Sequence, residues 1–274
     1  MSEKADINAY FERVGFAGSI APNLSTLATL HALHPAAIPF ENLSVLMNEP
    51  VLLDQPSLNR KLLREKRGGL CYEHNFTFMR VLRELDFTVK AHGARTLWNN
   101  PEGPLPARNH MLLTVNLDGT NYLADVGFGG RTLTAPLRLR AEVEQDTPHG
   151  VFRLMGADPA WRLEAKVGED WRPMYQFDMT EYLLADAEVA SHYVATHPDS
   201  SFRQRLMAAR VEPGKRHTLN NTSYGIHHGD GEVERRELTS LEEVRDVLAG
   251  PFKIAVPTSG VLDEAISRIL AAAQ

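Results

Sequence analysis

The sequence predicts an α+β protein, because the spacing of its apolar residues changes twice along the chain. Up to about residue 85 these residues recur at helical spacing, and after Asp86 they alternate as they do in strands. Beyond about residue 190 the helical and strand patterns are mixed. A chain of 274 residues also exceeds the usual size of a single domain. We therefore expect three regions, residues 1–86, 87–189 and 190–274.

The first region is predicted to be a bundle of four helices. Asp6, Asn23 and Ser57 are placed to cap the first three of them. Gly68 and Gly69 end the third, because glycine is unfavourable inside a helix. The fourth helix follows this glycine pair, and its apolar face is formed by Phe78, Val81, Leu82 and Leu85.

The second region is predicted to be an antiparallel sheet or barrel. Its strands are expected at residues 88–96, 151–154, 161–167 and 171–177. A further hairpin is expected within residues 110–126, because Asp118-Gly119 is a strong signal for a two-residue turn between apolar runs.

This hairpin determines how far apart His110 and Asp125 lie. If Asp118-Gly119 forms the turn, Leu117 pairs with Thr120. His110 and Asp125 are then diagonal neighbours on one face of the hairpin, roughly 7–8 Å apart at the backbone. The carboxylate can reach the imidazole ring across that gap, unless a bulge shifts the register.

The third region is predicted to contain a hairpin at residues 218–238, with Gly229-Asp230-Gly231 at its turn. Ser240 and Glu243 form a capping box that opens a helix ending near Gly250. A last helix has its apolar residues at Leu262, Ala265, Ile266 and Ile269.

The composition indicates a soluble, cytoplasmic protein. Cys71 is the only cysteine, which excludes an intrachain disulfide and a Cys-rich zinc site. The net charge of −6 argues against nucleic acid as the main partner. No apolar run approaches membrane-spanning length, and the first residues contain no apolar signal segment. His227 and His228 have no further ligand at suitable spacing, so we expect an exposed turn there and no metal site.

Cys71 is the first candidate for chemistry. It follows the glycine pair at the start of a predicted helix. Unsatisfied N–H groups and the positive end of the helix dipole favour a thiolate there, and the thiolate is the nucleophilic form of cysteine. A lone cysteine is also often a small buried apolar residue, so this position leaves both interpretations open.

His110 and Asp125 complete the set that cysteine catalysis needs, namely a nucleophile, a base and a group that orients the base. The alternatives are an exposed histidine at a strand end and a carboxylate that caps a glycine turn. The three residues together favour a catalytic triad. Gly127-Phe128-Gly129-Gly130 follows directly and could bring backbone N–H groups close to an anion, although a sharp turn at a strand end is the alternative.

The segment Arg67-Gly68-Gly69-Leu70-Cys71-Tyr72-Glu73-His74-Asn75 resembles the signature of the arylamine N-acetyltransferases, in particular the bacterial type. Residues 38–43, 109–110, 125–129 and 197–202 are similar to that family too, in the same order. The resemblance implies an N-terminal helical bundle, a central antiparallel β-barrel and a C-terminal α/β lid. It also implies an active site similar to that of papain-like and transglutaminase-like cysteine enzymes.

The resemblance further implies roles for single residues. Acetyl-CoA would acetylate the cysteine of a triad formed by Cys71, His110 and Asp125. A flat pocket for an aromatic acceptor would be lined by Phe40, Phe128 and Phe202. Contacts with acetyl-CoA are expected at Thr96, Gly127 and Gly129.

Two further expectations come from the residues themselves. His74, three residues after Cys71, is expected to be a structural hydrogen-bonding residue. Arg67 is expected to clamp residues 39–43 beside the cysteine through a bidentate pair with Glu41, because an acid and a base in two dense motifs each need a partner.

The function implied by the resemblance is transfer of an acetyl group from acetyl-CoA to the nitrogen of arylamines or arylhydrazines, by a ping-pong mechanism through an acetyl-cysteine. Acetyl-CoA is then a co-substrate, and no tightly bound cofactor and no metal are expected. A homodimer is compatible with the sequence. The alternatives are a cysteine hydrolase or thioesterase on the same scaffold, and a binding protein in which Cys71 is inert.

Overall fold

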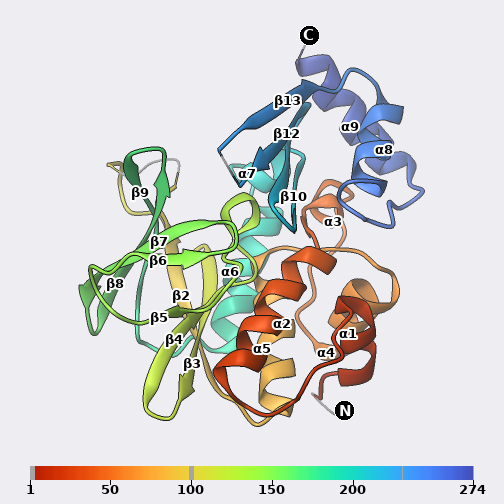
Figure 1. Cartoon of the computed structure of the whole chain (residues 1–274). Helices are drawn as coiled ribbons and strands as arrows, with labels where there is room; N and C mark the ends of the chain where they lie inside the picture. Colours follow the sequence, from red (N-terminus) through yellow and green to blue (C-terminus); the bar gives the residue numbers. More distant parts are fainter. Residues whose placement is uncertain (1–3, 99–101, 230, 274) are drawn as a thin grey trace.

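The N-terminal part of the fold is built from short helices (Figure 1). The computed structural model of the chain describes residues 4–98, 102–229 and 231–273. The helical segments are α1 (Ile7–Val14), α2 (Leu24–Ala37), α3 (Leu43–Leu46), α4 (Gln55–Leu58), the π-helical η1 (Asn59–Arg64) and α5 (Cys71–Glu84). α5 begins at Cys71, which confirms the predicted place of the cysteine.

Two of the three predicted helix caps are confirmed. The side chains of Asp6 and Asn23 accept hydrogen bonds from the backbone at the start of α1 and α2. The third prediction was wrong, because Asp54 is the cap of α4 and accepts from the N–H of Ser57 at 3.0 Å. Pro56 in the first turn suits this earlier start, since proline has no N–H to leave unpaired there.

The glycine pair before α5 allows a close approach of three chain segments. A Cβ on Gly69 would lie 2.6 Å from Oε2 of Glu73, and a Cβ on Gly68 would collide with the carbonyl oxygen of Pro39. The Pro39 segment therefore lies directly against the loop that leads into Cys71.

The central part is a nearly closed antiparallel barrel of eight strands, in the order β5-β4-β3-β2-β9-β8-β7-β6. The strands are β2 (Thr88–Thr96), β3 (His110–Leu117), β4 (Thr120–Ala124), β5 (Leu137–Arg138), β6 (Gln145–Thr147), β7 (Gly150–Ala157), β8 (Ala160–Val167) and β9 (Asp170–Asp178). Between the two outer strands, the side chain of Gln145 bonds to the backbone N–H and carbonyl of Arg138. A 3₁₀ turn, η2 (Gly129–Arg131), follows β4.

The register of the β3–β4 hairpin confirms the prediction. Leu117 pairs with Thr120, and Leu113 pairs with Ala124 at the far end. Asp118 and Gly119 both have positive φ, 49° and 81°, as a two-residue turn of this kind requires. Asp125 is the first residue after the paired part of β4.

The C-terminal part combines a second sheet with helices. Its sheet has the order β1-β10-β11-β12-β13. The strands are β1 (Phe40–Glu41), β10 (Met207–Glu212), β11 (Lys215–Asn220), β12 (Ser223–His228) and β13 (Val233–Glu237), and the helices are α6 (Leu184–Thr196), α7 (Ser201–Gln204), α8 (Leu241–Ala249) and α9 (Gly260–Ala272). β12 pairs with β13, which confirms the predicted hairpin over residues 223–237, although Asp230 at its turn lies outside the described residues. Residues 218–220, expected in the same hairpin, belong to β11.

Ser240 caps α8 as expected, accepting from the N–H of Glu243 at 3.2 Å. The carboxylate of Glu243 accepts from the N–H of Thr239, one residue before the cap, which differs from a regular capping box.

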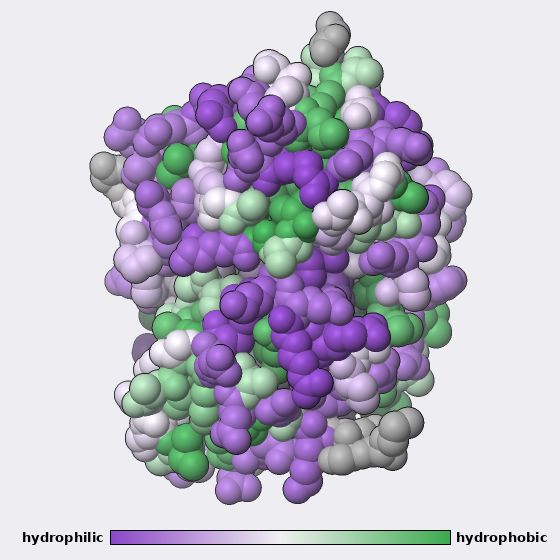
Figure 2. Space-filling model, turned by 90° about the vertical axis from the view of Figure 1, so that its right-hand side faces the viewer, coloured by the Kyte–Doolittle hydropathy of each residue, from purple (hydrophilic) through white to green (hydrophobic). Residues whose placement is uncertain are grey.

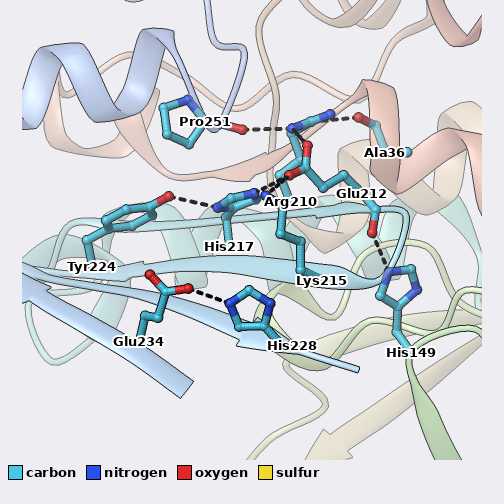
Figure 3. A network of polar contacts seen from close by, with 10 residues as sticks. All are labelled: Ala36, His149, Arg210, Glu212, Lys215, His217, Tyr224, His228, Glu234 and Pro251. Carbon is cyan, nitrogen blue, oxygen red and sulfur yellow. Dashed lines mark hydrogen bonds and ion pairs between the residues drawn. The ribbon is translucent and has the colours of Figure 1, made fainter. Parts of the chain in front are cut away.

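A strand pairing and several hydrogen bonds join the N-terminal part to the C-terminal part. β1 adds to the edge of the C-terminal sheet, with Phe40 opposite Ala209. Arg210 on β10 donates to the carbonyl of Ala36 at 2.7 Å and to that of Pro251 at 2.8 Å (Figure 3). The backbone of Glu212 accepts from His149 of the barrel at 2.7 Å in the same network (Figure 3). The boundaries of the three regions stay a prediction.

On the face drawn in Figure 2, apolar side chains form scattered patches that hydrophilic side chains separate. None of the helices in the described part of the chain is long and apolar enough to cross a membrane.

Candidate active site

Cys71 occupies the first position of α5 and is 4% exposed. The helix start is held by Glu73, whose carboxylate accepts the N–H of Leu70 at 2.8 Å and pairs with Lys61 at 2.8 Å. The thiol is thus buried, as a small apolar residue would be, but it also lies beside the His110 side chain and interacts with it. Burial of Cys71 is therefore compatible with its role as a reactive thiol.

His110 and Asp125 are joined by a hydrogen bond from Nε2 to Oδ2 of 2.7 Å. His110 is 3% exposed and Asp125 is fully buried. The other carboxylate oxygen accepts from Nδ2 of Asn75 and from the N–H of Gly127, both at 3.0 Å. The structure thus brings together the three residues that the sequence indicated. Because Nε2 is bonded to Asp125, the remaining ring nitrogen of His110 is the one available to Cys71.

Asn75 connects the helix to the barrel and was not predicted as a site residue. It lies four residues after Cys71, on the same face of α5. Its Nδ2 also donates to the carbonyl of Met111 at 2.7 Å, and its Oδ1 accepts from the N–H of Val126 at 3.2 Å. This four-residue spacing was the signal in the sequence that could have found it.

The electrostatics of the pair favour an imidazolium and a carboxylate. Burial alone would lower the pKa of His110, but the charge of Asp125 and hydrogen bonds to Asp125 and Cys71 outweigh it and raise the pKa to about 10. Burial alone would raise the pKa of Asp125, but the charge of His110 and hydrogen bonds from His110, Asn75 and Gly127 lower it.

The glycine turn packs directly on the cysteine. A Cβ on Gly127 would lie 2.9 Å from Cα of Cys71, so only glycine fits this approach. Gly129 has φ +75°, and a Cβ there would lie 3.4 Å from the ring of Phe40. Thr96 ends β2, and its N–H donates to Oδ1 of Asn109 at 3.0 Å.

The three expected phenylalanines are all partly buried. The ring of Phe128 lies 5.1 Å from that of His110. The rings of Phe40 and Phe202 are 6.0 Å apart. Tyr175 of β9 was missed by the sequence analysis, and its ring lies 5.0 Å from His110 and 5.3 Å from Phe128. Nothing in the alternating pattern of this strand distinguished Tyr175 from a core residue.

Tyr175 is fully buried, with its hydroxyl close to the Asp125 carboxylate. Burial, the charge of Asp125 and hydrogen bonding to its carboxylate raise the pKa of Tyr175 well above the usual range. The hydroxyl is therefore neutral beside the carboxylate.

His74 lies in a buried chain of hydrogen bonds, as expected of a structural residue. Its Nε2 donates to the carbonyl of Pro39 at 3.1 Å. Its Nδ1 must then accept from Nε2 of His34, and Nδ1 of His34 must accept from the hydroxyl of Tyr10, both at 2.9 Å.

Arg67 pairs with Glu41, but not in the bidentate form that was predicted. Its Nε and Nη2 both lie 2.8 Å from the same oxygen, Oε1. The second oxygen of Glu41 is engaged by the N–H of Leu43 at 2.6 Å. The carboxylate of Glu41 therefore binds Arg67 through one oxygen and the first residue of α3 through the other.

His227 and His228 lie in β12, so the expectation of an exposed turn was wrong. His227 bonds to Thr218 at 3.0 Å and His228 to Glu234 at 2.6 Å. In the described residues no three His, Cys, Asp or Glu side chains are grouped closely enough to hold a metal ion.

Comparisons with known proteins agree with this geometry. A family model described as N-acetyltransferase matches residues 23–261. The chain is 40% identical over 251 residues to an arylamine N-acetyltransferase of Escherichia coli, covering 91% of this chain and 89% of that protein. The solved structure of the Mycobacterium marinum arylamine N-acetyltransferase has a TM-score of 0.93 at 37% identity, covering 97% of this chain and 100% of that one.

A second structure of the Mycobacterium marinum protein, in complex with CoA, has a TM-score of 0.92 at 37% identity and covers 96% of this chain and 99% of that one. The family model and these relatives extend over nearly the whole chain and include the residues of the site. The chain therefore belongs to the arylamine N-acetyltransferase family.

Proposed function

We propose that this protein transfers an acetyl group from acetyl-CoA to the nitrogen of arylamines or arylhydrazines through an acetyl-cysteine. The observation that carries the proposal is the arrangement of Cys71 at a helix start beside His110, whose Nε2 is bonded to Asp125 at 2.7 Å. The names of the relatives and the CoA complex of one of them support the donor and the acceptor class.

In the first half-reaction, Cys71 attacks the carbonyl carbon of the thioester as a thiolate. The protonated His110 stabilises this thiolate by its charge. The carbon–sulfur bond to coenzyme A then breaks, and the leaving thiolate takes the proton from His110. The products are free coenzyme A and acetylated Cys71.

In the second half-reaction, the amine attacks the acetyl carbon and gives its proton to His110. Acetylation removes the charge that the sulfur carries as a thiolate, and hydrogen bonding to Cys71 contributes to the raised pKa of His110. His110 is therefore a better base in the acetyl-enzyme than in the free enzyme. Cleavage of the acetyl–sulfur bond restores the thiolate and the imidazolium.

The acceptor would lie against Phe40, Phe128 and Phe202. Phe128 packs on His110, which places one wall of such a pocket beside the base. We assign the contacts with acetyl-CoA to Thr96, Gly127 and Gly129, as the resemblance implies. The close packing of Gly127 on Cys71 and of Gly129 on Phe40 supports the two glycines. A cytoplasmic location and a homodimer stay predictions.

The competing function is a cysteine hydrolase or thioesterase, which would form the same acyl-enzyme. A transferase must hold the thioester until an amine reacts in preference to water. Binding of an aromatic ring supplies this preference by raising the effective concentration of the amine. An aliphatic amine of equal size would be a poorer acceptor, because it is protonated at neutral pH and stacks less well.

The rate of coenzyme A release distinguishes a transferase from a thioesterase. With acetyl-CoA alone we expect one equivalent of coenzyme A per enzyme, followed by slow hydrolysis. With an arylamine present we expect rapid turnover and parallel double-reciprocal lines. Coenzyme A release that is as fast without amine as with it would identify a thioesterase and contradict the proposal.

A further inference from the structure

A pocket on the outer face of the barrel carries more positive than negative charge. It lies over β2, β9, β8 and β7 and has a volume of ≈ 470 Å³, which is within the usual range of small-molecule sites. We call it the barrel-face pocket and define it by the polar side chains that line it, which are Arg95, Arg108, Arg162, Gln176 and Asp178.

Three of these side chains form one row across the strands. Arg95 of β2 pairs with Gln176 of β9, which in turn pairs with Arg162 of β8. Residues adjacent to them in sequence, such as Leu163 and Phe177, belong to the core inside the barrel, so the row faces outward. One strand lies between Arg95 and Arg162, which places their backbones roughly 10 Å apart. Side chains as long as arginine can therefore reach one ligand from both sides.

Arg108 enters the pocket from the segment before β3. A Cβ on Gly93 would lie 3.1 Å from Cδ of Arg108, so the glycine leaves the space in which this side chain crosses β2. The guanidinium of Arg108 forms an ion pair with Asp178, and each of these side chains is 35% exposed. Arg162 has a partner outside the pocket, since its Nη2 lies 2.7 Å from Oε1 of Glu164. Both arginines are thus positioned by carboxylates at the surface.

Arg95 has no counter-charge among the side chains that the structure describes, because none of the ion pairs there includes it. Its Nη1 donates to the carbonyl of Pro106, which leaves the other N–H groups of the guanidinium to a ligand. The lining of the pocket contains three guanidinium groups and one carboxylate. Such a site favours an anion, and the planar fork of arginine matches a phosphate or a carboxylate.

The same arginines hold the segment that leads into the active site. Arg95 bonds to Pro106, four residues before His110. The backbone carbonyl of Arg108 accepts from the hydroxyl of Tyr72, the residue after the nucleophile, at 3.5 Å. A ligand that fixes these guanidinium groups would therefore also fix the chain that positions the catalytic base.

We propose that the barrel-face pocket binds a small organic anion, with its phosphate or carboxylate group between Arg95 and Arg162, and that its occupancy is coupled to the position of His110. The site is separate from the triad. His110 pairs with Ala94, whose side chain is in the barrel core, and Arg95 is on the opposite face of the strand. The coupling rests on the proposed function, whereas the binding does not.

The first test measures binding of two probes, glycerol 3-phosphate and succinate, by isothermal titration calorimetry at constant ionic strength. Coenzyme A is present at saturation, so its own site is occupied and the probes report a second site. We expect one probe to bind each chain, and the tighter probe identifies a phosphate monoester or a dicarboxylate as the ligand class. Absence of binding by both probes would overturn the inference. If coenzyme A does not bind, the proposed function fails, and the same titration without it still tests the pocket.

Variants locate the probe. Arg95→Gln and Arg162→Gln should each weaken its binding about tenfold, the size of a lost hydrogen bond to a charged group. Arg162 does not contact the segment before His110, so its variant keeps the test valid if Arg95→Gln does not fold. Arg268→Gln removes one charge from an exposed position on α9 and should keep the affinity of the wild type. Wild-type affinity in Arg162→Gln would contradict the assignment of the site.

Turnover tests the coupling. With acetyl-CoA and an arylamine at saturation, the probe should raise kcat of the wild type about twofold or more, because a fixed segment keeps His110 in its productive position. Arg162→Gln should need about tenfold more probe for the same increase. An unchanged or lowered kcat would contradict the coupling, and a wild-type protein that acetylates no arylamine would refute the proposed function instead.

Discussion

The hydrogen bond from Nε2 of His110 to Asp125 determines which ring nitrogen faces Cys71. Asp125 in turn is oriented by Asn75 and by the N–H of Gly127. At the scale of single residues, the chemistry therefore depends on a carboxylate held in place from two sides. Two predictions address this arrangement.

Asp125→Asn should lower kcat by about 10³–10⁴-fold, because an amide no longer selects the correct tautomer of His110. The circular dichroism spectrum should stay that of the wild type. Asp170→Asn, at the exposed start of β9, is the matched control and should keep full activity. An Asp125→Asn variant with near wild-type turnover would argue against the triad.

Alkylation of Cys71 by iodoacetamide should be fast at neutral pH. The reason is that His110, with its pKa raised to about 10, stays protonated at neutral pH and supports the thiolate. In His110→Ala the reaction should be slow at neutral pH and accelerate as the pH rises. A native protein that does not react would mean that Cys71 is an ordinary core thiol.

At the scale of elements, α2 and α5 are in contact through buried histidines, which are His31 and His34 of α2 and His74 of α5. Burial lowers the pKa of His31 and of His74 to about 4, and it lowers that of His34 well below the usual value. The N–H of Asp125 donates to Nε2 of His31 at 3.2 Å, so this helix pair also contacts the active site. All three histidines are neutral in the folded protein.

Folding stability should therefore decrease in acid. The unfolded chain binds protons at these histidines below about pH 6.5, whereas folded His31 and His74 bind them only near pH 4. The contribution of His31 and His74 to stability is full above pH 6.5 and is lost as the pH falls toward 4, by at most about 3 kcal/mol for each of them. Urea denaturation at pH 7.5, 6 and 5 measures this slope.

His192→Gln, at an exposed position of α6, should keep the slope of the wild type. His74→Asn should reduce it, because one of the titrating groups is removed. A wild-type stability that does not change between pH 7.5 and 5 would contradict the neutral state of these histidines.

The Arg67–Glu41 pair joins β1 to the loop before α5. Both side chains are buried, so Arg67→Lys and Glu41→Gln should each destabilise the protein by about 2–4 kcal/mol. The double mutant should be less destabilised than the sum, with a coupling of about 1–3 kcal/mol. The exposed pair Arg60–Glu65, 3.7 Å apart, is the control, and its double-mutant cycle should be additive. Additive effects of the Arg67 and Glu41 substitutions would mean that their contact does not contribute to the stability of the folded protein.

At the scale of the whole molecule, Asn42 connects the N-terminal part to the C-terminal sheet. Its Nδ2 donates to the carbonyls of Phe202 at 2.8 Å and Arg205 at 2.6 Å. Its Oδ1 accepts from the N–H of Met207 at 2.8 Å. The same side chain therefore positions one wall of the proposed acceptor pocket and the start of β10.

Asn42→Ala should lower stability by about 2–4 kcal/mol, since buried backbone groups lose their partners. It should also raise the KM for an arylamine more than the KM for acetyl-CoA, because Phe202 loses its anchor. Asn121→Ala is the control, because Asn121 bonds to Asn116 at the exposed surface of the β3–β4 hairpin and should change neither constant. Equal effects on both KM values would indicate general loosening instead of a displaced Phe202.

The sequence by itself determined the features that depend on neighbouring residues. The start of α5 at Cys71 follows from the glycine pair, and the placement of His110 near Asp125 follows from the Asp118-Gly119 turn and the two-residue period of strands. The Arg67–Glu41 pair was also foreseen, because an acid and a base in two dense motifs each needed a partner.

Only the tertiary structure decided the contacts between distant segments. The pairing of β1 with β10, the anchoring of Phe202 by Asn42 and the place of Tyr175 beside His110 join residues far apart in the chain. The local spacing of residues does not predict which strands are neighbours, or which hydrogen-bond partner a buried polar group has. These are settled by packing and by the pairing of buried hydrogen-bonding groups, which act only after distant segments have come together.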